Sequence, residues 1–117
     1  MDRRTLVAAI GHVGAGMVAI GLLPAGVMKL SGNPEMVAHF AGWGFPGFFV
    51  YLIGAVEVAA AVLTVVPRTR LIGAGIALAV MVAAAGTHLL HGEAGQMAPA
   101  LVIGALAGIT GWTAVPR

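Results

Sequence analysis

Four long apolar runs occupy most of this chain and limit what it can fold into. They cover approximately residues 5–28, 45–66, 71–90 and 97–115. About 20 mostly apolar residues are enough for a helix to cross a lipid bilayer. The chain has 117 residues, of which 60% are hydrophobic and 9% are charged, and a soluble domain of this size could not bury so much apolar surface. The sequence therefore predicts a single all-α integral membrane domain over residues 1–117.

The connections between the runs indicate how the helices are arranged. Residues 67–70 and 91–96 form short links, so the helices that they join should be antiparallel neighbours. Many glycines and alanines occur in the runs, and small residues let membrane helices approach one another closely. Gly104 and Gly108 are an example in the last run. The expected product is an antiparallel four-helix bundle.

The first connection, residues 29–44, is longer and carries helix signals of its own. Asn33 and Pro34 are typical of the N-cap and first position of a helix, and Gly42 can end it. Trp43 would lie at the depth of the lipid headgroups. We expect a short interfacial helix in this loop.

The positive charges predict the orientation of the bundle. With four spans, one side receives all the arginines, namely Arg3, Arg4, Arg68, Arg70 and Arg117. Lys29 falls on the other side with Glu35 and Glu93. The positive-inside rule then predicts a protein of the cytoplasmic (inner) membrane with both termini in the cytoplasm and the first loop outside. The six Lys and Arg residues form no basic patch, so we expect no binding to nucleic acid.

Glu57 is an acid in the middle of an apolar run. It shares a helix face with Gly54 and Thr64, so it should point into the bundle. At 1.5 Å per residue, Glu57 lies about 16 Å from Arg68, near the middle of the bilayer. It could bind a proton, fix helix packing by a hydrogen bond, or take part in ligand or proton handling. The same counting puts Lys29 about 15 Å too far outward to pair with Glu57, and it makes His88 the nearer partner.

Other polar residues lie toward the outer side. His39 belongs to the expected interfacial helix, whereas His91 and Glu93 should be solvated in the last outer loop. His88 and His91 could share a metal ion, but two ligands do not make a site and cysteine is absent, so no metal is predicted. His12 lies in the inner half of the bilayer, and we interpret it as a packing residue. The candidate ligand-binding residues are Lys29, His39, Tyr51, Glu57 and His88, with Glu57 and His88 also candidates for catalysis.

The chain carries, in order, the pairs Gly26/Lys29, Gly44/Pro46 and Gly54/Glu57, and then His88. With these motifs, residues 14–93 resemble the DoxX-like family of small four-helix membrane proteins. The family's namesake is a membrane subunit of a thiosulfate:quinone oxidoreductase, and some distant relatives look like chaperones for other membrane proteins. The resemblance implies that Lys29, Glu57 and His88 contribute to a quinone or lipid-headgroup site.

Three functions follow as hypotheses. The first is a membrane subunit of a redox-linked complex that binds quinone or a lipid-like ligand in its outward half, as an accessory subunit of an oxidoreductase with partner redox subunits. The alternative is a non-catalytic lipid-binding or assembly protein, which could form oligomers. The third is a small proton-coupled transporter, which the position of the acid in the second run disfavours.

Overall fold

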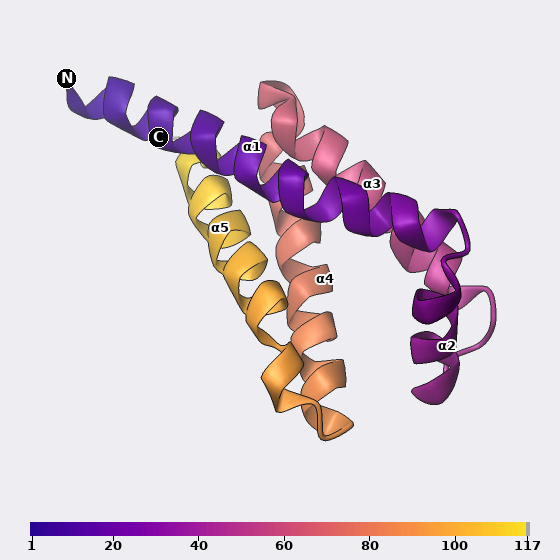
Figure 1. Cartoon of the computed structure of the whole chain (residues 1–117). Coiled ribbons are helices and arrows are strands. Elements are labelled where there is room, and N and C mark those ends of the chain that lie inside the picture. Colours follow the sequence, from indigo (N-terminus) through magenta and orange to yellow (C-terminus); the bar gives the residue numbers. More distant parts are fainter. Residues whose placement is uncertain (117) are drawn as a thin grey trace.

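The computed structural model describes residues 1–116, and these residues form helices and no strand (Figure 1). The α-helices are α1 (Arg3–Leu30), α2 (Pro34–Gly42), α3 (Phe49–Val65), α4 (Arg70–Leu90) and α5 (Ala98–Ala114). Two 3-10 turns, η1 (Pro67–Thr69) and η2 (Ala94–Gln96), precede α4 and α5. The predicted all-α class is confirmed. Arg117 lies outside the described residues.

The four long helices pack as a ring in which each packs mainly against two others. α1 packs against α3 and α5, and α4 packs against the same two helices, so α1 and α4 lie on a diagonal. α1 and α5 run antiparallel, because Gly11 of α1 faces Thr113 of α5 whereas Gly21 faces Ile103. α4 and α5 are also antiparallel, since Gly104 faces Met81 and Gly111 faces Ala74. The pair α1/α3 and the pair α4/α5 spread apart toward the end that carries α2 (Figure 1). The shared core consists mainly of alanines around Val18, Leu22 and Met81.

The helices differ in how well they could cross a membrane. α1 has 28 residues, and the continuous stretch Pro67–Leu90 has 24 residues, and both are long and apolar enough to span one. α3 and α5 are also apolar but have 17 residues each, which is the short limit for a span. The described chain therefore contains two helices that could span a membrane on length and composition, and two shorter apolar helices packed against them.

The predicted short helix in the first loop is confirmed as α2. The side chain of Asn33 accepts hydrogen bonds from the backbone N–H groups of Glu35 and Met36 at 3.1 and 3.3 Å, and Pro34 occupies the first helical position. The helix ends at Gly42, and Trp43 is its C-cap residue. The buried Phe40 faces the rings of Phe45 and Phe49, so the underside of α2 is held onto the start of α3 by aromatic packing.

Some glycines lie at helix contacts and others do not. A Cβ on Gly14 would overlap the hydroxyl of Thr110, so α1 and α5 touch there through small groups. Gly104 also faces α4, where a Cβ would come within 3.3 Å of Met81 Cβ, but nothing lies within 4 Å of a Cβ at Gly108. The predicted small-residue face on the last helix is therefore correct for Gly104 and wrong for Gly108, which faces outward from this bundle.

Arg70 is a buried residue at the end of the bundle opposite α2. Its Nε donates to the carbonyl of Thr64 at 2.8 Å and its Nη2 to the carbonyl of Val65 at 3.1 Å, which satisfies the open end of α3. Its Nη1 lies 3.3 Å from Nδ1 of His12 on α1. Because Arg70 is 7% exposed, it is a structural link between α1, α3 and α4 rather than a charge at the surface. His12, which we expected to be a packing residue, is exposed and contacts Arg70 through one ring nitrogen.

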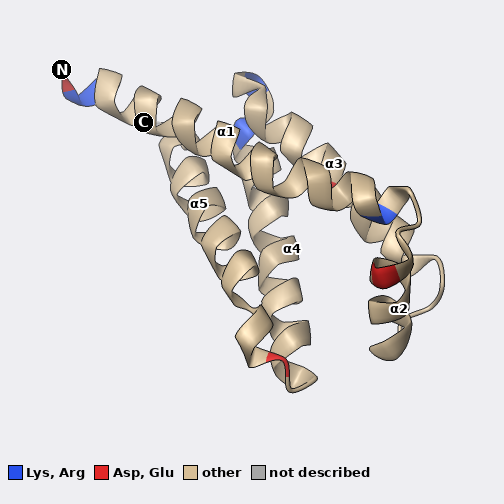
Figure 2. Ribbon diagram, in the orientation of Figure 1, with Lys and Arg blue, Asp and Glu red and all other residues tan. Residues whose placement is uncertain are grey.

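The charged residues separate along the molecule (Figure 2). The described arginines lie where α1 begins and where α3 meets α4. Lys29, Glu35 and Glu93 lie toward the opposite end, on α1, on α2 and in the loop before α5. This end is called the outer end below, because it carries the loop that the charge pattern predicts to be outside.

Candidate functional site

A lysine and a glutamate form a buried ion pair between α1 and α3. Lys29 Nζ lies 2.8 Å from Glu57 Oε1, and the two side chains are 12% and 4% exposed. Glu57 belongs to the buried face of α3 with Gly54 and Thr64, which confirms that it points into the bundle. Oε1 is fully buried, and Lys29 is the partner that the described residues provide for it. The carboxylate is therefore held by the ammonium group of Lys29.

Two glycines allow this pair to form. A Cβ on Gly26 would lie 2.8 Å from the carbonyl oxygen of Gly54, and a Cβ on Gly54 would lie 2.9 Å from the carbonyl oxygen of Gly26. The backbones of α1 and α3 therefore touch at this crossing. Lys29 and Glu57 each follow their glycine by three residues, so both project beside the crossing. The repeated Gly-x-x-charge pattern of the sequence therefore brings the opposite charges of Lys29 and Glu57 together.

The expectation that Lys29 lies too far outward to reach Glu57 is wrong. It assumed that α1 and α3 begin at the same inner level. The Gly26–Gly54 crossing shows that they do not: Arg3 to Gly26 is about 34 Å long, whereas Gly54 to Val65 is about 16 Å. α1 therefore extends about 18 Å further at the inner end. This extension accounts for the distance of about 15 Å by which Lys29 was expected to lie too far outward.

His88 has a different partner from the one expected. Its Nδ1 lies 2.8 Å from Oε1 of Glu93, and the indole Nε1–H of Trp43 donates to the same oxygen at 3.2 Å. The preference for His88 over Lys29 as the partner of Glu57 is therefore wrong. Glu93 is also not simply solvated, since it joins the C-terminus of α2 to the end of α4. The hydrogen bond with His88 holds the pKa of Glu93 below its usual range.

Aromatic rings surround this junction. Trp43 stacks on His39 with ring centres 5.4 Å apart and meets the edge of His88 at 5.3 Å. His91, exposed as expected, lies tilted to Trp43 at 6.2 Å and approaches the carbonyl of Thr87. The indole is thus the centre of the contact between α2 and the loop that follows α4.

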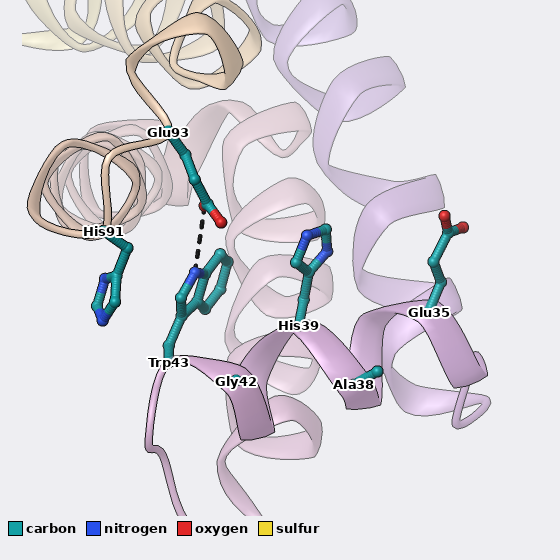
Figure 3. Close-up of a pocket in the computed structure, with 7 residues that line it drawn as sticks. All are labelled: Glu35, Ala38, His39, Gly42, Trp43, His91 and Glu93. Carbon is teal, nitrogen blue, oxygen red and sulfur yellow. Dashed lines mark hydrogen bonds between the residues drawn. The ribbon is translucent and has the colours of Figure 1, made fainter.

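A hollow of about 450 Å³ opens between α2 and the α4–α5 connection (Figure 3). It is lined by Glu35, Ala38, His39, Gly42, Trp43, His91 and Glu93. Among residues 1–116, no three His, Asp or Glu side chains are grouped so that they could hold a metal ion. The groups in the lining that can bind a ligand are its carboxylates and its aromatic rings.

The structure distributes the predicted site residues over two places. Lys29 and Glu57 form the ion pair, whereas His39 and His88 belong to the contacts of Trp43 and Glu93. Tyr51 is 43% exposed, and its hydroxyl would lie 3.3 Å from a Cβ on Gly32, just beyond the end of α1.

Sequence reasoning missed Trp43, Glu93 and Glu35 as lining residues. For α2 a signal was present, since Glu35, His39 and Trp43 are four residues apart and fall on one helix face. Glu93 had no such signal, because a loop residue acquires its partner only through the fold.

These features define an all-helical membrane protein with a polar pair between its helices. A family model described as the DoxX-like family matches residues 5–110, which is nearly the whole chain. The chain therefore belongs to the DoxX-like family, as the sequence motifs predicted. No curated protein and no solved structure gave a significant match.

Proposed function

We propose that this DoxX-like protein crosses the inner membrane with α1, α3, α4 and α5, and that it is a membrane subunit of a redox-linked complex. In this proposal it binds quinone or a lipid-like ligand in its outward half, with both termini in the cytoplasm. The observation that carries the proposal is the Lys29–Glu57 pair. Burying two charges among apolar helices is costly, and ionisable residues at such depth are commonly functional.

The chemistry of the pair fits a polar headgroup on an apolar tail. Among the described residues the carboxylate of Glu57 is paired with Lys29 alone, so it can accept a further hydrogen bond from a bound hydroxyl. Lys29 can donate to a carbonyl oxygen or stabilise an anion. Reduction of a quinone to a quinol takes up two electrons and two protons. Because the sequence has no cysteine, the electrons would come from the redox centre of a partner subunit. Glu57 would deliver protons to the quinone after taking them up from water, whereas His88 belongs to the separate junction with Glu93.

Exchange of both charged residues for neutral ones tests the proposal. The Lys29→Gln/Glu57→Gln variant removes both charges together, so it leaves no uncompensated ion. We expect native mass spectrometry of gently extracted wild-type protein to retain quinone or lipid, and the double variant to lose it. Quinone-dependent turnover in membranes should be lost in parallel.

The Arg68→Gln variant is the control, because Arg68 is exposed and lies at the other end of the bundle. It should retain ligand and turnover. Unchanged retention and turnover in the Lys29→Gln/Glu57→Gln variant, at an unchanged unfolding temperature, would overturn the proposal.

A lipid-binding or assembly role is the second candidate. It is favoured by the many large apolar side chains on the outside of α1, such as Val13, Ile20 and Val27, each more than half exposed. Such a surface suits lipid chains or partner helices. A stoichiometric partner in the same mass spectra, without any bound quinone, would favour this role over the first.

A further inference from the structure

The hollow at the outer end is separate from the Lys29–Glu57 pair and has its own chemistry. One wall is a single face of α2, from which Glu35, His39 and Trp43 point to the same side, with Trp43 next to Glu93 and Glu35 at the other end of the helix (Figure 3). Ala38 and Gly42 lie between them and are small, so the wall is recessed. The opposite side carries Glu93 and His91.

Both carboxylates that line the hollow have oxygen atoms that make no hydrogen bond. Glu93 uses Oε1 for Trp43 and His88, and its Oε2 has no hydrogen-bond partner within residues 1–116. The carboxylate of Glu35 makes neither a hydrogen bond nor an ion pair with any residue of the same range. No lysine or arginine is among the described residues that line the hollow. At a pH where histidine is uncharged, the lining therefore carries negative charge that no lysine or arginine balances.

Aromatic rings complete the lining. The imidazole rings of His39 and His91 lie 5.4 and 6.2 Å, centre to centre, from the indole of Trp43. Aromatic faces attract organic cations through the ring quadrupole, and tryptophan does so most strongly. A bare metal ion is disfavoured by the absence of three grouped ligands in residues 1–116. An anionic headgroup is also disfavoured, because the carboxylates of Glu35 and Glu93 would repel it.

We propose that this hollow binds an organic ammonium group. The carboxylates of Glu35 and Glu93 would neutralise its charge, and Trp43 would contact its methyl or methylene groups. Two sources have this chemistry: the headgroup of a zwitterionic phospholipid, and a free amine or quaternary ammonium compound outside the membrane. The site does not depend on whether Lys29 and Glu57 bind quinone.

Fluorescence of Trp43 provides the test. The chain has two tryptophans, so the full-length Trp112→Phe protein reports on Trp43 alone. The protein is held at pH 8, where histidine is ordinarily uncharged, in a detergent without an ammonium group. Choline is titrated, and 3,3-dimethylbutanol, its uncharged isostere, is titrated in parallel. We expect a saturable change with choline and none with the alcohol.

Charge variants separate binding from folding. In the Trp112→Phe background, Glu35→Gln should weaken choline binding about fivefold, the factor expected for one partly exposed charge contact. Because the Glu35 side chain holds no structural contact in residues 1–116, the variant should fold normally. Arg68→Gln at the other end should leave choline binding unchanged. Equal responses to choline and the alcohol, or no saturation with either, would overturn the proposal.

The lipid around the protein distinguishes the two sources. In nanodiscs of phosphatidylglycerol, choline should bind as it does in detergent. If a lipid headgroup is the natural ligand, nanodiscs that contain phosphatidylethanolamine should weaken choline binding by competition. If a soluble amine is the ligand, choline should bind equally in both. Either result supports the ammonium site, and loss of saturable binding in both kinds of nanodisc contradicts it. The Lys29→Gln/Glu57→Gln variant should bind choline normally, so failure of the quinone proposal would be seen separately.

Discussion

Lys29 Nζ and Glu57 Oε1 are 2.8 Å apart at a crossing where the backbones of α1 and α3 touch at Gly26 and Gly54. The close approach of the two backbones is what allows the two charges to meet. A larger residue at either glycine would separate the helices and stretch the ion pair. The helix contact and the ion pair at this place therefore depend on the same four residues.

The coupling of the charges can be measured by single and double substitution. Lys29→Met leaves the Glu57 carboxylate buried without a counter-ion, and it should lower the free energy of unfolding by about 3 kcal/mol. The double variant Lys29→Met/Glu57→Leu has no buried charge and should recover most of that loss. Denaturant unfolding in detergent micelles provides the values. If the two substitutions simply added, the residues would not be coupled.

The glycine crossing gives a second prediction with a matched control. Gly26→Val would press side-chain carbons against the carbonyl of Gly54 and Cγ2 of Val58, so it should lower the unfolding free energy by about 2 kcal/mol. Gly75→Ala on α4 is the control, because a Cβ there has nothing within 4 Å. It should be neutral or slightly stabilising, since alanine favours helix. Similar losses in both variants would show that helix contact is not the cause.

Acid should release α2 from the α4–α5 connection. The pKa of Glu93 is lowered, chiefly by the hydrogen bond with His88, so the ionised form stabilises the folded contact. That stabilisation is complete above the ordinary value of 4.5 and is lost as the pH falls below it, through the lowered folded value. In Trp112→Phe protein, the emission of Trp43 should therefore change in this acid range.

A variant without the titrating group is the control for this transition. Glu93→Gln should show the acid-like emission of Trp43 already at neutral pH and should have no further change below pH 4.5. An unaltered acid transition in Glu93→Gln would assign the pH effect to another group, such as Glu35.

The two arginines near the start of α4 should behave differently. Arg70→Gln removes the donors to the carbonyls of Thr64 and Val65 and the contact with His12, and it should cost about 2 kcal/mol or more of unfolding free energy. Arg68→Gln removes an exposed charge and should change stability by less than about 0.5 kcal/mol. Thermal unfolding of the two purified variants compares them directly, and equal effects would contradict the structural role of Arg70.

Much of the architecture follows from local patterns along the chain. Long apolar runs and short connections predict helices and antiparallel neighbours. Asn33-Pro34 predicts the start of α2, because capping involves groups a few residues apart. The buried face of α3, with Gly54, Glu57 and Thr64, follows from the helical period alone.

Partners across helices depend on relative register, which no local pattern contains. Counting residues gave the correct length of α1 and of α3 taken separately. The 28-residue α1, however, extends beyond α3 at the end opposite α2, and because of this offset Lys29 meets Glu57. Likewise, Glu93 is an ordinary loop acid until packing of α2 places Trp43 beside it. The chain's residue pattern determined the helices and their inward faces; the tertiary packing decided which charges meet, because the offset of one rigid helix along another is set by where their surfaces interlock.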